Sequence, residues 1–137
     1  MIRVVVDTNV LVSALLQPLG LPAAVLMRAL SGGVQMCVSD AVLAEYEEVI
    51  RRPHLKRDAE VIDGTLRSVR EIARHVTPAT SANACSDPDD NMFLDCAEAA
   101  RADYLVTGNQ RHFPERWRKT RVVGVREFIE ILIQEQG

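Results

Sequence analysis

The chain has 137 residues, of which 47% are apolar and 26% are charged, and its formal net charge is −3 at pH 7. This length is typical of one domain, so we expect a single domain over residues 1–137 with a core that needs no disulfide or metal staple. The composition argues against disorder and collagen-like repeats. The mild acidity argues against a protein that coats nucleic acid through bulk charge.

The pattern of apolar residues predicts an alternation of strands and helices. The β-branched run at the start is typical of a buried strand in a parallel sheet. Ser39 is a good N-cap for a helix that would end before Pro53. The elements expected in the first half are a strand over 2–6, helices over 9–16 and 22–31, a strand over 34–38, and helices over 40–51 and 58–75.

The second half continues the alternation after a small, polar loop over 77–86. Asp87 is a good N-cap and Pro88 suits the first position of a helix that would run to about Arg101. The remaining elements expected are strands over 104–107 and 121–125 and an apolar helix over 126–135. This order predicts an α/β fold, a three-layer α/β/α sandwich with a central parallel sheet.

Cysteines and histidines are few and unpaired along the chain. Cys37, Cys85 and Cys96 show no C-x-x-C spacing, which is typical of a reduced, cytoplasmic setting. The three histidines lack the spacing of a structural zinc site. Asp7 interrupts the first apolar run and no run reaches 18 residues, so we expect neither a signal peptide nor a membrane-spanning helix.

Acidic residues stand where the predicted fold would gather ligands. Open parallel sheets bind ligands at the carboxyl ends of their strands, and Asp7 follows the first strand directly. A helix N-cap is the alternative role for Asp7. Glu45 stands among apolar positions of the helix over 40–51, where an unpaired acid is costly; a carboxylate on the rim is the alternative.

A second acidic group begins the helix after the polar loop. The number of acids here is larger than helix capping needs, although the helix dipole would favour each of them: Asp87, Asp89 and Asp90. Their mutual repulsion favours a bound cation, and oxygen donors without paired His or Cys indicate Mg²⁺ or Mn²⁺. Carboxylates that converge on such a cation suit phosphodiester hydrolysis. The chain has none of the glycine-rich or serine motifs of nucleotide-binding proteins and serine hydrolases.

Four segments in this order resemble the PIN-domain family: V-V-V-D-T-N-V-L-V-S-A-L, S-D-A-V-L-A-E-Y, D-P-D-D-N-M-F-L-D-C-A and A-D-Y-L-V-T-G-N. The resemblance spans residues 2–125 and is greatest to the VapC-like toxin components of prokaryotic toxin–antitoxin modules. It implies a compact α/β/α fold and a metal-dependent ribonuclease. It also implies that Asp7, Glu45 and Asp90 are the catalytic acids and bind the metal.

The same resemblance extends to polar residues beside the acids, and it contains one departure. Thr8 and Asn9 match the polar pair after the first acid, and Thr107 would supply a hydroxyl near the site. The family's fourth acid usually follows the V-T-G step, where this chain has Asn109. An amide offers a carbonyl ligand but no charge to hold a second cation, unless Asp87 or Asp89 compensates.

A basic segment follows the last of these motifs. Residues 111–126 carry six basic side chains and one acid, a net +5 that is typical of a phosphate-binding rim. Trp117 and Phe113 are candidates to stack on bases of single-stranded RNA. The alternative is a solvated basic loop with core aromatics. The residues expected to bind RNA are Arg111, Arg116, Arg118 and Lys119.

The chemistry indicated is hydrolysis of single-stranded RNA by a cytoplasmic endoribonuclease, and two rivals stay open. One is a PIN-fold module that binds RNA or protein without cutting, which Asn109 motivates. The other is a phosphatase of the haloacid-dehalogenase type, which would need an acid where Asn9 stands. The resemblance further implies a homodimer, a small antitoxin as partner and no membrane association.

Overall fold

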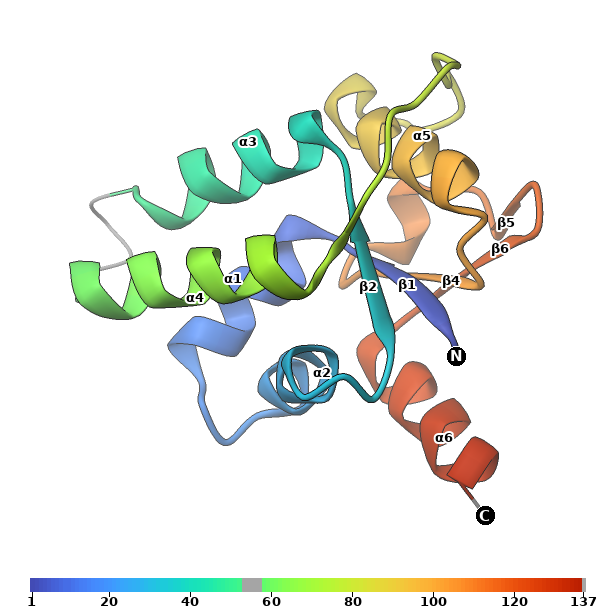
Figure 1. Ribbon diagram of the computed structural model, residues 1–137. Helices are drawn as coiled ribbons and strands as arrows, with labels where there is room; N and C mark the ends of the chain where they lie inside the picture. Colours follow the sequence, from blue (N-terminus) through green and yellow to red (C-terminus); the bar gives the residue numbers. More distant parts are fainter. Residues whose placement is uncertain (53–57, 137) are drawn as a thin grey trace.

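The computed structural model describes residues 1–52 and 58–136 and confirms the predicted mixed α/β architecture (Figure 1). Most observed bounds lie within two residues of the predicted ones. The elements are β1 (Arg3–Val6), α1 (Thr8–Leu16), α2 (Leu21–Leu30), β2 (Gln35–Val38), α3 (Asp40–Ile50), α4 (Ala59–Ile72), β3 (Arg74–His75), the 3-10 helix η2 (Pro88–Asp90), α5 (Asn91–Ala100), β4 (Tyr104–Val106), the 3-10 helix η3 (Gln110–His112), β5 (Arg116–Trp117), β6 (Thr120–Val123) and α6 (Val125–Gln136).

The described strands form one sheet in the order β3-β2-β1-β4-β6-β5. All neighbouring pairs run parallel except β5 and β6, which form an antiparallel edge. The central parallel sheet was predicted, whereas β3 and β5 were not, because two-residue strands are too short to show a periodic pattern. At the turn between β5 and β6, Arg118 has a φ of 54°.

The helix expected over 58–75 is shorter in the structure. It ends at Ile72, because Arg74 and His75 pair with β2 as β3. The helix predicted from Asp87 begins instead with one 3-10 turn before α5. The polar segment 77–86 contains no helix or strand, as expected. Pro53, the expected stop of α3, lies outside the described residues.

Helices lie on both sides of the sheet. The helix α5 packs on β1, β2 and β4, while α2 and α6 contact each other on the opposite side (Figure 1). The helix α3 contacts both α1 and α5 near the carboxyl ends of the strands. This arrangement is the predicted α/β/α sandwich, and it leaves the strand ends as the place where several elements meet.

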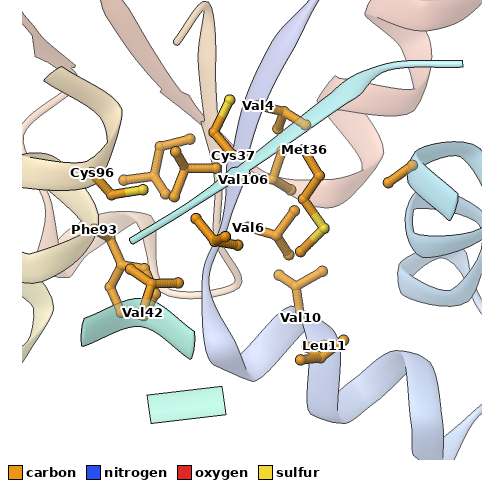
Figure 2. Close-up of a cluster of buried hydrophobic side chains, with 14 of the residues drawn as sticks. Val4, Val6, Val10, Leu11, Met36, Cys37, Val42, Phe93, Cys96 and Val106 are labelled. Carbon is orange, nitrogen blue, oxygen red and sulfur yellow. The ribbon is translucent and has the colours of Figure 1, made fainter. Parts of the chain in front are cut away.

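The two faces of the sheet supply the two halves of the core. Figure 2 shows Met36 and Cys37 on opposite sides of β2, with Met36 on the side of Val10 and Cys37 on the side of Cys96. All four side chains are at most 3% exposed. Because successive strand residues point to opposite faces, a strand segment buried on both sides must be apolar throughout, as β1 is from Val4 to Val6 and β2 from Met36 to Val38.

Within the described residues, no single helix is both long and apolar enough to cross a membrane. Only the pair α1 and α2, bent by 105° at the break between them, reaches that length and composition together.

Candidate functional site at the carboxyl edge of the sheet

The parallel strands bring three chain segments to one edge. Val6 of β1 is level with Val106 of β4, so the residues that follow them, Asp7 and Thr107, are neighbours. A cleft of about 420 Å³ opens at this edge. Its lining includes the three predicted acids together with two further predicted residues, namely Asp7, Glu45, Asp90, Asp87 and Asn109.

Asp7 is only 5% exposed and occupies the position between β1 and α1. Its backbone carbonyl accepts the N–H of Val10 at 3.0 Å, as at a helix N-cap, but its carboxylate makes no capping hydrogen bond. Oδ2 instead accepts a hydrogen bond from Oγ1 of Thr107 at 2.7 Å. The side chain of Asp7 is therefore held by Thr107, the residue after β4, and does not cap α1.

Burial raises the pKa of the Asp7 carboxyl above its usual value. The hydrogen bond from Thr107 opposes this rise, as do the backbone amides of Thr8 and Asn9 and the charge of His112. Asp7 is thus a buried acid with several groups that favour its ionised form. Such a balance is common at functional sites.

The predicted polar residues form a network around Asp7. Thr107 is fully buried, and its Oγ1 accepts the backbone N–H of Asn109 at 2.9 Å. Oδ1 of Asn9 accepts the backbone N–H of Gly108 at 3.3 Å. These bonds join the start of α1 to the turn after β4, so Asn9 serves as a tether between the two segments.

A second wall of the cleft is formed by Asp87, which precedes η2, and Asp90, the last residue of η2. Oδ1 of Asp87 accepts the N–H of Asp89 at 3.0 Å and so caps this short helix. Asp90 lies half-buried, and burial together with the negative charges of Asp7 and Asp87 raises its pKa to about 6. Asn91 fixes this wall, because its Oδ1 accepts the N–H groups of residues 84 and 85 in the preceding loop.

Glu45 reaches the cleft from α3, although not from the buried stripe on which we expected it. That stripe consists of Val42, Tyr46 and Ile50, whereas Glu45 is half-buried beside it. Burial raises the pKa of Glu45, and the charges of Glu48, Asp89 and Asp7 add to this effect while Arg52 opposes it. Our expectation that Glu45 lies on the buried face of α3 is therefore wrong, because its side of the helix faces the cleft.

Two nitrogen-bearing side chains of the cleft, those of His112 and Arg52, were not predicted. Nδ1 of His112 lies 3.7 Å from Oδ2 of Asp90, and the position follows the G-N turn by three residues. Arg52 lines the cleft from just beyond the end of α3. Helix-face spacing could not have indicated Arg52, because this residue lies outside both the predicted helix over 40–51 and the observed α3.

The basic segment lies mostly elsewhere, which corrects our expectation that it flanks the acids. Arg111 follows Asn109 in η3 beside the cleft. Arg116 pairs with Arg121, which is level with the first residue of β4, so the hairpin of β5 and β6 turns at the amino edge of the sheet. At that edge Arg118 binds Glu98 at 3.0 Å and Lys119 binds Asp103 at 3.2 Å.

The two aromatic candidates are also engaged within the protein. Phe113 is 7% exposed and belongs to the core. Nε1 of Trp117 donates to Glu98 at 3.1 Å, and the guanidinium of Arg118 lies 4.6 Å from the centroid of its indole ring. Both side chains therefore fit the alternative interpretation as packed aromatics.

The donor set of the cleft fits a hard divalent cation in its chemistry. It consists of carboxylate oxygens, an amide and hydroxyls, and Oγ1 of Thr8 is buried without a hydrogen-bond partner among the described residues. As these side chains stand, no three Asp, Glu, His or Cys residues of the described chain converge closely enough to hold a metal ion. Metal binding would therefore require side chains of this donor set to move closer together.

Comparisons with known proteins agree with the fold. Residues 3–111 match the model of a PIN-domain family. An uncharacterized protein, MJ1680 of Methanocaldococcus jannaschii, is 30% identical over 112 residues, which cover 80% of this chain and 72% of the relative. The residues that match the family model, 3–111, include Asn109 and the acids that line the cleft. The chain belongs to the PIN-domain family, whose fold is that of a nuclease.

Proposed function

We propose that the protein is a metal-dependent endoribonuclease that hydrolyses phosphodiester bonds of single-stranded RNA in the cytoplasm, as the toxin of a toxin–antitoxin pair. The observation that carries the proposal is the position of Asp7, Glu45 and Asp90 in one cleft. They come from three separate segments, after β1, within α3 and at the end of η2.

The acids of the cleft and Asn109 have definite tasks in this proposal. Asp7, Glu45 and Asp90 would hold Mg²⁺ or Mn²⁺, with oxygens of Asp87 and Asn109 as additional ligands. Such a cation supplies Lewis-acid polarisation of a phosphodiester and lowers the pKa of water.

The other residues at this edge would orient the acids and the substrate. Thr107 holds the Asp7 carboxylate toward the cleft, because its Oγ1 donates to Oδ2 at 2.7 Å. Arg111, beside Asn109, is placed to attract the RNA backbone.

The direct test is cleavage of a fluorescent single-stranded oligoribonucleotide with Mn²⁺ or with a chelator. We expect metal-dependent cleavage that Asp7→Asn reduces at least a hundredfold. Glu71→Gln is a suitable control, because this acid is exposed on α4 away from the cleft. Cleavage by Asp7→Asn at the wild-type rate would overturn the assignment.

A PIN-fold module that binds RNA without cutting is the second candidate, and Asn109 favours it. The amide carries no charge, so Asn109 offers the cation a weaker ligand than an acid would. Mn²⁺ titration calorimetry separates the candidates. Metal binding that disappears in Asp90→Asn supports the nuclease, whereas a wild-type protein that binds RNA but no Mn²⁺ supports the binding module.

A homodimer and a small antitoxin complete the proposal. Light scattering on the purified protein tests the dimer, and a monomeric mass would contradict it. For the antitoxin, the neighbourhood of the gene is informative: a short adjacent reading frame that encodes a DNA-binding pattern supports a toxin. Co-expression with that product should then suppress RNA cleavage.

A further inference from the structure

Arg52 lies in line with Glu45 along the cleft. Glu45, Val49 and Arg52 follow one another at i, i+4 and i+7, and all three line the cleft. The helix α3 ends at Ile50, and the backbone N–H of Arg52 donates to the carbonyl of Val49 at 3.2 Å in the turn that follows. Arg52 therefore lines the cleft from just beyond the end of α3, whereas Glu45 lines it from within the helix.

The carboxylate of Glu48 binds the Arg52 guanidinium along one edge, formed by Nε and Nη2. Nη2 donates to both oxygens of Glu48, at 3.2 Å and 2.9 Å, and Nε donates at 3.4 Å. Nη1 has no acceptor among the residues that the structure describes, and the side chain is 49% exposed. Since a guanidinium offers five donors in a fixed plane, the anchored group keeps N–H donors for a second anion.

The charge of the cleft gives Arg52 a specific role. Asp7, Asp87, Asp90 and Glu45 would repel the phosphates that flank a cleavage site, even when a cation neutralises part of their charge. His112 is engaged close to Asp90, at 3.7 Å. Arg52 has no cleft acid within ion-pair distance among the described residues, and its own partner Glu48 does not line the cleft.

We propose that Arg52 is a phosphate-positioning residue, which binds the RNA backbone next to the phosphate that faces the carboxylates. This inference rests on the proposed function, which it deepens by fixing the path of the RNA along α3. An Arg suits this task, because its planar fork makes two parallel hydrogen bonds to a phosphate.

The matched control is the neighbouring Arg51. It also pairs with a Glu one turn earlier, Glu47, and with Asp63 of α4, but it does not line the cleft. The experiment measures binding of a fluorescent single-stranded oligoribonucleotide by anisotropy, over a series of salt concentrations. It uses the Asp7→Asn protein with Mn²⁺, so that cleavage does not interfere.

In this background we expect Arg52→Gln to weaken binding about three- to tenfold and to reduce the slope of log K against log salt by about 0.7, as expected when one phosphate contact is lost. Arg52→Lys should retain the slope, and Arg51→Gln should bind as the parent does. In the cleaving protein Arg52→Gln should raise KM more than it lowers kcat.

Three results would overturn the inference: an unchanged slope in Arg52→Gln, an equal loss in Arg51→Gln, or no measurable RNA binding by the parent. Its failure is distinguishable from failure of the proposed function. A protein that cuts RNA but ignores Arg52→Gln loses only the role of Arg52. A protein that binds RNA through Arg52 but never cuts it loses only the nuclease.

Discussion

Thr107 donates a 2.7 Å hydrogen bond to Asp7 across 100 residues of sequence. Both residues follow the last paired residues of neighbouring parallel strands, Val106 and Val6. The bond is fully enclosed, since Thr107 is 0% exposed and Asp7 is 5% exposed. It joins the most buried acid of the cleft to the residue that follows β4, so the position of this acid depends on the pairing of β1 with β4.

Thr107→Val removes that bond while it keeps the shape of the side chain. The change leaves Oδ2 of Asp7 and the N–H of Asn109 without their partner, so we expect a loss of about 1–3 kcal/mol in the free energy of unfolding. Urea denaturation measures the loss. Thr107→Ser keeps the hydroxyl and should recover most of the stability; equal losses in both variants would contradict this account.

The stability of the metal-free protein should fall as pH rises through the acidic range. The pKa of Asp90 is raised from 3.8 to about 6, first by burial and then by the charges of Asp7 and Asp87. A carboxyl with a higher pKa in the folded chain binds more protons there than in the unfolded chain. The stabilisation is therefore present below about pH 4 and is lost as pH rises through about 6. Asp89 adds to the rise and His112 opposes it.

Melting temperatures of chelator-treated protein between about pH 4 and pH 7 measure this dependence. Asp90→Asn should flatten the profile, because its side chain does not titrate. Glu71→Gln, an exposed acid remote from the cleft, should retain the wild-type slope. A profile of Asp90→Asn that overlays the wild type would show that another group controls the stability.

Tyr46 sets the position of α3 relative to β1. Its hydroxyl donates to the backbone carbonyl of Val6, and its side chain is 0% exposed. The bond therefore joins the neighbour of Glu45 to the neighbour of Asp7. Tyr46→Phe leaves this carbonyl without its buried donor and should destabilise the protein by about 1–3 kcal/mol.

Tyr104→Phe is the matched control for this substitution. The ring of Tyr104 packs edge-to-face on Phe128 at 5.7 Å, a contact that Phe retains. Denaturation midpoints should therefore fall for Tyr46→Phe and change little for Tyr104→Phe. If the two variants lose equal stability, the hydrogen bond to Val6 contributes nothing beyond removal of a hydroxyl.

Asn109→Asp should strengthen metal binding, because it adds a negative charge to the lining of the cleft. Its backbone N–H would still donate to Thr107, so the local fold should persist. We expect Mn²⁺ affinity to rise about tenfold by calorimetry and metal-free stability to fall, since the new charge repels Asp7 and Asp90. The same gain in Mn²⁺ affinity in an Asn109→Ala variant would contradict this explanation.

The strands and helices were predictable because local patterns determine them. The β-branched residues before Asp7, the Ser39 cap and the D-P-D-D start of the helical segment all act within a few residues. The positions of Asp7 and Asp90 next to those signals were therefore visible in the sequence, as was Glu45 among the apolar positions of a predicted helix, and the family motifs supplied the role of these acids. The two-residue strands β3 and β5 exist only through their partners, and no local pattern indicates them.

The sequence by itself determined which acids stand at the ends of which elements. Only the tertiary structure decided that β4 lies beside β1, which places Thr107 on Asp7 and raises the pKa of both Asp7 and Asp90 through burial. It also turned the basic hairpin to the amino edge and brought Arg52 to the cleft. Strand order and side-chain burial are long-range properties, so they follow from the packing of segments that the sequence keeps far apart.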